Sequence, residues 1–170
     1  MPSLTVRVLP TKQLVAEGLH DAIIKLDRRN MAPILAETDT PFPEAKRRKA
    51  FEIDGTFILA LSSTSQIVGY LEICPDWEDP QDLYISSVQI EPQHRRGPVF
   101  GRLLGEAVRV LADRPFRNLK THAQKHNQQA LSLYRRLGFA VSPNPASNKS
   151  FRLSATRAIL QTRLARRLQL

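Results

Sequence analysis

Residues 94–104, HRRGPVFGRLL, place two arginines and two glycines where an apolar segment gives way to an amphipathic one. A strand, a turn rich in backbone donors and a helix N-terminus can together hold phosphate, because the first helical N–H groups and the positive end of the helix dipole face the anion. Gly97 and Gly101 would let the backbone approach the anion closely. Arg95 and Arg96 would add charge-assisted contacts. The stretch therefore predicts an anion-binding turn.

A second stretch, residues 127–139 (NQQALSLYRRLGF), is predicted to form one helix that ends at Gly138. Asn127 and Tyr134 are seven residues apart and share a face of that helix. A tyrosine phenol, with an ordinary pKa near ~10, stays protonated at neutral pH and can act as an acid. Asn127 is equally suited to cap the helix, and Tyr134 could instead be a core tyrosine whose hydroxyl is hydrogen-bonded.

Together the two stretches resemble the GNAT superfamily of acyl-CoA-dependent N-acyltransferases, and the resemblance is sharp from about residue 84 to residue 139. The turn of that family follows the pattern Arg/Gln-x-x-Gly-x-Gly/Ala. When the pattern is anchored on Gly101, Arg96 is its leading residue and Val99 replaces its middle glycine. When it is anchored instead on Pro92 and Arg95, the turn is one residue longer than usual. Pro98 also removes one potential donor. A binding turn with an altered phosphate grip is therefore expected.

The resemblance implies that acetyl-CoA is the acyl donor. Asn127 would contact the pantetheine-diphosphate side of the cofactor, and Tyr134 would protonate the departing thiolate. A strand over 83–90 would pair with the pantetheine arm, and a backbone N–H near Val88 or Gln89 would stabilise the charge that develops on the thioester oxygen. The residues expected to contact the cofactor are Val88, Gln89, Ile90, Arg95, Arg96, Gly97, Val99, Phe100, Gly101, Arg102, Asn127 and Tyr134.

The group that deprotonates the acceptor amine is left open. Many GNAT relatives carry a carboxylate on the strand that here carries Ser86 and Ser87. Glu72, Asp82 and His122 are the candidate bases, and a chain of water molecules is an equal alternative. Glu72 and Asp82 could instead be solvated surface carboxylates, and His122 a strand-surface residue.

The element order predicts one α+β domain over 1–170, a mixed sheet flanked by helices as in the GNAT fold, with a motif core over 84–139. Strands are expected over 4–9, 57–61, 66–73, 83–90, 118–124, 139–141 and 151–155; helices over 11–26, 44–51, 100–111, 127–137 and 159–170; and a loop over 28–43. The basic tail, 157–170, carries an apolar row of Ile159, Leu160, Leu164 and Leu168. This row needs a surface, which could be this domain, a second copy of the chain or an acidic partner.

Cysteine usage and hydropathy limit the environment of the protein. A single cysteine, Cys74, excludes an intrachain disulfide framework. No apolar run approaches the ~20 residues that cross a bilayer, and the first residues do not form a secretory signal. We therefore expect a cytoplasmic protein with no membrane partner. His122 and His126 lack a third ligand nearby, so no metal is expected.

The chain is basic, with 25 Lys and Arg residues against 16 Asp and Glu and a net charge of +9. Such a surface favours anionic partners. The expected function is transfer of acetyl from acetyl-CoA to a primary amine of a small molecule or protein, by direct attack in a ternary complex. The acid-rich residues 75–82 favour a cationic acceptor. The alternatives are an acyl-CoA-binding or interaction module without turnover, and an enzyme whose amine is linked to RNA, such as aminoacyl-tRNA. A homodimer is a further alternative.

Overall fold

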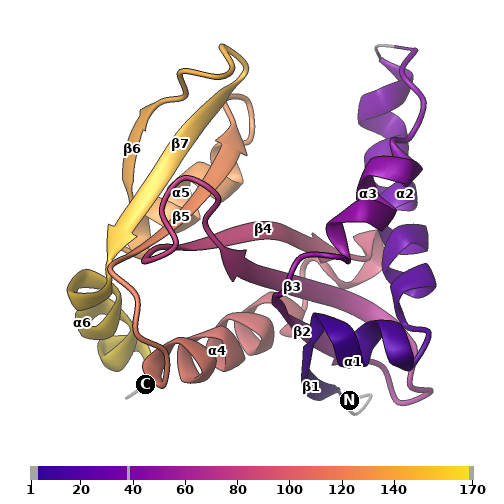
Figure 1. The fold of residues 1–170 in the computed structure, drawn as a ribbon, viewed down its shortest axis with the longest axis horizontal. Helices are drawn as coiled ribbons and strands as arrows, with labels where there is room; N and C mark the ends of the chain where they lie inside the picture. Colours follow the sequence, from indigo (N-terminus) through magenta and orange to yellow (C-terminus); the bar gives the residue numbers. More distant parts are fainter. Residues whose placement is uncertain (1–3, 38, 169–170) are drawn as a thin grey trace. The chain divides into compact units, whose positions relative to one another are not determined.

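The structure is a computed structural model that describes residues 4–37 and 39–168, and it confirms the expected α+β fold (Figure 1). The strands are β1 (Thr5–Pro10), β2 (Thr56–Leu61), β3 (Ile67–Pro75), β4 (Leu83–Ile90), β5 (Asn118–Gln124), β6 (Ala140–Pro143) and β7 (Ser150–Thr156). The helices are α1 (Thr11–Ala16), α2 (His20–Ala36), α3 (Glu44–Ala50), α4 (Val99–Ala112), α5 (Gln128–Arg136) and α6 (Arg157–Leu168), and a short 3-10 turn, η1 (Pro92–His94), precedes α4.

The strands follow the order β1-β2-β3-β4-β5-β7-β6. β4 pairs with β5 in parallel through Leu83 with Leu119 and Tyr84 with Lys120, whereas β1–β2, β2–β3, β5–β7 and β6–β7 are antiparallel.

The chain divides into two compact units: unit 1 comprises Met1–Cys74 and Ser86–Ala107, and unit 2 comprises Pro75–Ile85 and Val108–Leu170. β4 and α4 each contribute residues to both units. The expected single domain stays a prediction.

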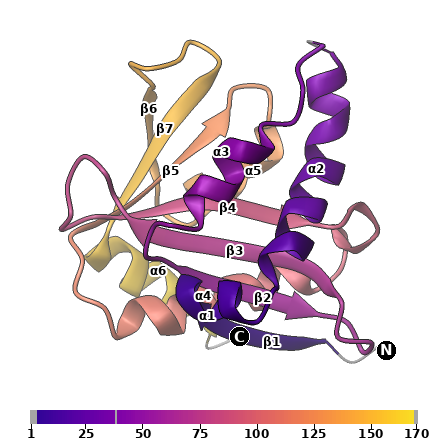
Figure 2. The same cartoon turned by 45° about the vertical axis from the view of Figure 1, so that its right-hand side comes forward.

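Unit 1 buries the apolar sides of α1 and α2 against β1, β2 and β3 (Figure 2). The core residues of this layer are Leu9, Leu14, Ile23, Leu26, Phe57, Leu59, Leu61 and Tyr70. Ile58 and Ala60, which alternate with them on β2, are fully buried as well. Both faces of β2 are therefore covered, which explains why its sequence is a continuous apolar run rather than an alternating one.

The helix α4 begins with a buried row, Val99, Leu103 and Ala107, at four-residue spacing. Val99 packs on β3, where a side chain added at Gly69 would stand 3.0 Å from the Val99 Cγ1 atom. Gly69 and Tyr70 are adjacent on a strand and so face opposite sides. Since Tyr70 lies in the layer of α1 and α2, α4 begins on the other face of β3.

The predicted loop over 28–43 was wrong in its first half, because α2 continues to Ala36 with Pro33 inside it. A proline inside a helix removes the N–H that would bond the carbonyl four residues earlier. That carbonyl belongs to Arg29, which is exposed, so water can satisfy it. The predicted helix over 11–26 is in fact two helices, separated where Gly18 takes a positive φ of 70°.

Unit 2 contains β5, β6, β7, α5 and α6, with α5 against β5 (Figures 1 and 2). Gly138 ends α5 with a φ of 92°, as its predicted C-cap role requires. A Cβ at Gly138 would clash with the Cγ2 atom of Ile159, so α6 packs closely on this turn. Leu160 is buried, which favours the domain itself as the surface for the tail. The side chains of Leu164 and Leu168, like residues 169–170, lie outside the described part of the chain.

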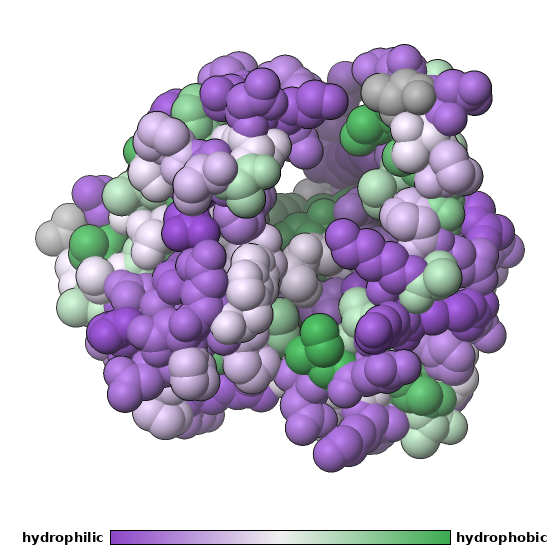
Figure 3. Space-filling view, turned by 45° about the horizontal axis from the view of Figure 1, so that its top comes forward, coloured by the Kyte–Doolittle hydropathy of each residue, from purple (hydrophilic) through white to green (hydrophobic). Residues whose placement is uncertain are grey.

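Hydrophilic side chains cover most of the face shown in Figure 3, and hydrophobic ones form small separate patches there. Among the described helices, none combines the length and the hydropathy needed to cross a bilayer. The described residues also include no cluster of three or more His, Cys, Asp or Glu side chains that could hold a metal ion.

Candidate active site

The predicted anion-binding turn lies in unit 1, between η1 and α4. The N–H of Arg102 donates to the Pro98 carbonyl at 3.0 Å, which closes the first turn of α4. The N–H groups of Val99, Phe100 and Gly101 precede that bond, so they are the donors that a helix start leaves for other acceptors. A Cβ at Gly101 would have no neighbour within 4 Å, so space lies beside these donors.

The arginine side chains around the turn differ in whether they are available to a ligand. Arg95 and Arg96 are exposed, although the Arg95 Nε donates to the Ile90 carbonyl at 3.2 Å. The Arg102 Nη1 donates to the Leu4 carbonyl at 2.7 Å, which directs this predicted phosphate contact toward the start of β1.

Val99 points into the core rather than into the turn, because its side chain is 1% exposed and meets Gly69. Its replacement of the family glycine therefore serves packing and leaves the space beside Gly101 open.

The predicted pantetheine strand contributes three half-buried residues, Val88, Gln89 and Ile90. Asn30 of α2 donates to the Gln89 Oε1 at 2.9 Å and to the Ile90 carbonyl at 3.1 Å. These bonds hold the end of β4 against α2 within unit 1.

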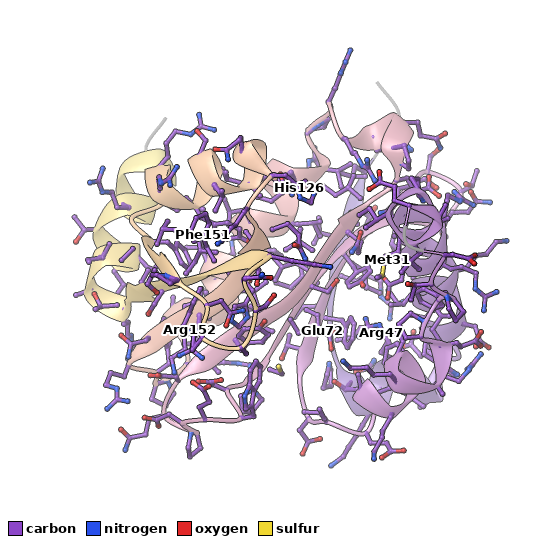
Figure 4. The ribbon with its side chains drawn as sticks, turned by 90° about the horizontal axis from the view of Figure 1, so that it is seen from above. Met31, Arg47, Glu72, His126, Phe151 and Arg152 are labelled. Atoms are coloured by element: carbon purple, nitrogen blue, oxygen red, sulfur yellow. The ribbon has the colours of Figure 1, made fainter. Side chains whose placement is uncertain are left out.

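A buried ionic cluster, which we call the Arg47 network, also lies in unit 1. The Arg47 guanidinium donates to Asp27 at 2.7 Å, to Glu72 at 2.8 Å and to the Tyr70 hydroxyl at 3.2 Å. Figure 4 shows Arg47 and Glu72 beside one another. The Tyr70 hydroxyl donates to Asp27 and lies 3.0 Å from the Ser87 hydroxyl. Glu72 is thus a buried, ion-paired residue, and the alternative of a solvated surface carboxylate was wrong.

Burial shifts the pKa values of the charged residues in the Arg47 network. It raises the pKa of Asp27 and of Glu72 above their ordinary values, although Arg47 and, at Asp27, Tyr70 act in the opposite direction. Burial lowers the pKa of Arg47, but the facing Tyr70, Glu72 and Asp27 outweigh it and raise that pKa overall. One fixed cation therefore faces two carboxylates that are costly to ionise.

The predicted acid, Tyr134, lies in unit 2 on α5. Its ring meets Phe139 edge-on at a centroid distance of 5.1 Å, and its hydroxyl is hydrogen-bonded to the side chain of Thr121 on β5. Burial raises the pKa of Tyr134 above 10.0, and the Thr121 bond lowers it only in part, so the phenol is protonated at neutral pH. Asn127 caps α5 by accepting the Ala130 N–H at 3.1 Å, as its alternative role predicted.

Asp82 of unit 2 is 1% exposed, so the surface alternative was wrong for this residue too. It accepts hydrogen bonds from the Asn118 backbone and side chain at 3.0 Å each, and pairs with Lys120 at 2.8 Å. Burial raises the pKa of Asp82, but these bonds outweigh it and lower the pKa overall. Such a carboxylate is a poor proton acceptor.

His122 of β5 belongs to an aromatic cluster in unit 2, the His122 cluster, with Tyr84 and Trp77. The Tyr84 hydroxyl lies 2.7 Å from the His122 Nδ1. Trp77 meets Tyr84 edge-on at 4.7 Å and stacks on the His122 ring at 6.5 Å. The His122 Nε2 is buried and has no hydrogen-bond partner among the residues that the structure describes.

The carboxylates of residues 75–82 form ion pairs within unit 2. Asp76 pairs with Lys120 at 2.5 Å and Glu78 with Arg152 at 2.8 Å, while Asp79 pairs with Arg117. The expectation of a cationic acceptor was drawn from these carboxylates, and it stays a prediction.

The structure thus places Tyr134 beside Thr121 and His122 beside Tyr84. The carboxylates of Glu72 and Asp82 are instead paired with Arg47 and Lys120. The partners that sequence reasoning missed are Asp27, Arg47, Tyr84, Thr121 and Arg152. Only Thr121 had a usable signal, because it alternates with His122 along a predicted strand and must therefore face the opposite side.

Comparisons with known proteins agree with the fold. A profile of the Acetyltransferase (GNAT) family matches residues 22–139. No curated protein sequence matches the chain. Among solved structures, the chain is similar to the PaiA N-acetyltransferase from Thermoplasma acidophilum in complex with coenzyme A (17% identity, TM-score 0.65, covering 91% of this chain and 99% of that one). It is also similar to an acetyltransferase from Thermus thermophilus (23%, 0.64, 92% and 99%) and to a putative phosphinothricin N-acetyltransferase (20%, 0.67, 91% and 98%).

Proposed function

Because the chain belongs to the acetyltransferase (GNAT) family, we propose that it transfers acetyl from acetyl-CoA to a primary amine by direct attack in a ternary complex. The observation that carries the proposal is the half-buried, protonated Tyr134. It lies on α5, the helix that Asn127 caps, and is hydrogen-bonded to Thr121 of β5. The Thermoplasma acidophilum neighbour, which is in complex with coenzyme A, supports the choice of cofactor.

In this proposal the turn holds the phosphates of acetyl-CoA. The N–H groups of Val99, Phe100 and Gly101 would donate to the diphosphate, with Arg95 and Arg96 adding charge. The open space beside Gly101 fits this use, because a phosphate must approach the backbone closely.

The reaction itself would use β4 and α5. A backbone N–H near Val88 or Gln89 donates to the thioester oxygen as negative charge develops there, and one such donor is typically worth about 3 kcal/mol. Tyr134 gives its proton to the sulfur as the C–S bond breaks. Direct attack needs no covalent enzyme intermediate.

A thiol-release assay with acetyl-CoA tests the proposal against n-butylamine, spermidine, a lysine-containing peptide and an aminoacyl-tRNA. We expect release with at least one amine and formation of its N-acetyl product. Binding of acetyl-CoA without release would favour the interaction module, and no binding at all in calorimetry would overturn the proposal. Activity confined to aminoacyl-tRNA and falling steeply with salt would indicate the RNA-linked amine.

Gly101→Leu tests the turn, with Gly105→Leu as its matched control. Both glycines lie in α4, and an added Cβ meets nothing within 4 Å at either position. We expect Gly101→Leu to weaken acetyl-CoA binding and to reduce the rise in Tm that the ligand produces, while Gly105→Leu binds like the wild type. Equal affinities for the two variants would move the phosphates away from this turn.

A further inference from the structure

The His122 cluster contains an atom that the rest of the described chain leaves unsatisfied. A buried polar nitrogen without a partner costs about 1–3 kcal/mol, and native proteins keep few such groups without a function. The ring is not free to turn toward a new partner, because Tyr84 is bonded to Nδ1 and Trp77 stacks on its face. The orphan Nε2 is therefore held in place for an atom that comes from outside the chain.

The position of His122 on β5 relates it to Tyr134. His122 follows Thr121 directly, so the two side chains face opposite sides of the strand. Thr121 bonds Tyr134 on the side of α5, and its hydroxyl also donates to the Ile85 carbonyl of β4 at 3.0 Å. The strand β5 thus has the proposed acid of α5 against one face and carries a fixed imidazole on the other.

Burial and the nearby Arg152 keep the imidazole neutral at neutral pH. Burial lowers the pKa of His122 below 6.5, and Arg152, its register partner on β7, lowers it further. Glu78 and Asp76 of the loop before β4 act in the opposite direction with a smaller effect. Arg152, which is labelled in Figure 4, is itself paired with Glu78.

We propose that His122 is the general base of the acetyl transfer, with Nε2 facing the acceptor amine and Tyr84 as the residue that positions the ring. This inference rests on the proposed function. It requires the tautomer in which Nδ1 carries the proton and donates it to the Tyr84 oxygen, because Nε2 must present its lone pair.

The acetyl transfer consumes and releases equal numbers of protons at His122 and Tyr134. The neutral amine attacks the thioester carbon, and as the N–C bond forms one N–H proton passes to the His122 Nε2. The C–S bond breaks and Tyr134 gives its proton to the sulfur. Water then carries the proton of the imidazolium to the phenolate, so amine and thioester become amide and thiol and both residues are restored.

The two carboxylate candidates are less suited to this role. Asp82 is held by Lys120 and Asn118, which favour its charged form. Glu72 is held by Arg47, which is bonded to Asp27 as well, so a proton taken by Glu72 would weaken a buried ion pair. His122 can accept a proton at Nε2 without breaking a hydrogen bond that the structure contains.

Nitrogen-15 NMR of the wild-type protein without any substrate gives the first test. At pH 7.5 the correlation pattern of the ring should show a neutral His122 with the proton on Nδ1, and the ring should titrate below pH 6.5. A proton on Nε2 would overturn the assignment, whether or not the protein turns over acetyl-CoA. Failure of the proposed function would show separately, as absent thiol release or absent acetyl-CoA binding.

Kinetics give the second test, with acetyl-CoA and the fastest amine of the four-member panel. His122→Gln should lower kcat/KM by about 10²–10⁴-fold and abolish the acidic limb of its pH profile. Tyr84→Phe should cause a smaller loss and move that limb to lower pH, because the imidazolium loses a hydrogen-bond acceptor.

His126→Gln is the matched control for these variants. His126 is an exposed histidine just beyond the end of β5, and its replacement should keep the wild-type profile. An acidic limb that survives in His122→Gln and disappears in Glu72→Gln would assign the base to Glu72 and overturn the proposal.

Discussion

The Arg47 network of unit 1 and the His122 cluster of unit 2 both bury polar groups among aromatic rings, and they differ in how far those groups are satisfied. Three N–H groups of Arg47 have partners, at 2.7, 2.8 and 3.2 Å. The imidazole of His122 has one partner at 2.7 Å and one buried nitrogen with none among the described residues. A closed network stabilises a fold, whereas a rigid group with an unused atom can act on a ligand. We therefore expect changes in the Arg47 network to affect stability and changes around the His122 cluster to affect turnover.

The largest effect is expected from Tyr134→Phe, which removes the acid and keeps the ring against Phe139. The value of kcat should fall by about 10²–10⁴-fold, the usual contribution of a general acid, while acetyl-CoA affinity changes little. Turnover under saturating substrate and calorimetry check the two halves of this prediction. An unchanged kcat would return Tyr134 to its alternative role as a core residue.

Arg47→Met should produce the largest loss of stability in unit 1. The substitution leaves Asp27 and Glu72 buried without their cation, and breaking a buried pair in this way typically costs about 3–5 kcal/mol of the free energy of unfolding. Urea denaturation measures it. Arg48→Met is the matched control, because Arg48 forms exposed pairs with Asp21 and Glu44 and should change stability little. Similar losses in both variants would contradict a closed network around Arg47.

Glu72→Gln tests the same network through pH. The folded pKa of Glu72 lies above 4.5, so between these two values the folded state binds more protons than the unfolded chain. The free energy of unfolding of the wild type should therefore fall as pH rises from 4.5 through the folded pKa. The glutamine variant lacks this contribution, so its stability relative to the wild type should rise with pH. Parallel stability curves for the two proteins would show that Glu72 is not desolvated.

The smallest effect on stability is expected from Trp77→Ala. The indole is 66% exposed and its main contact is the edge-on pair with Tyr84, a geometry worth about 0.5–1.5 kcal/mol. We expect a loss of about 1 kcal/mol in denaturation, with a change in the kinetics of the acceptor that exceeds any change in acetyl-CoA binding. A loss comparable to that of Arg47→Met would mean that the His122 cluster is a structural core.

Local signals in the sequence were enough to place the elements that carry the motifs. The ranges predicted for β4, Leu83–Ile90, and β5, Asn118–Gln124, match the structure, because each is an apolar-patterned run ended by a change of pattern. The C-cap role of Gly138 was likewise predictable, because helices commonly end at a glycine with a positive φ, and Gly138 has one. The helix through Pro33 was not, because its tolerance depends on exposure in the folded protein.

The environments of the candidate bases could not be predicted, and the reason is distance along the chain. Glu72 meets Arg47 across 25 residues, and His122 meets Tyr84 across 38. No periodicity or spacing rule reports such pairs. Sequence reasoning therefore named three candidates but assigned two of them, Glu72 and Asp82, to solvated surfaces as their alternative role, whereas both are buried.

The contact between Val99 and Gly69 has a consequence for how such chains are found and redesigned. Gly69 leaves a space on β3, and the branched side chain of Val99 at the start of α4 fills it. We therefore expect positions 69 and 99 to change together as related sequences diverge. A motif search that requires glycine at position 99 would miss this chain. Here the small residue stands at position 69 instead, where it leaves room for the Val99 side chain. Grafting a glycine-rich turn from a relative onto this scaffold would need a larger residue at 69 in the same step, since otherwise it would open a void between α4 and β3.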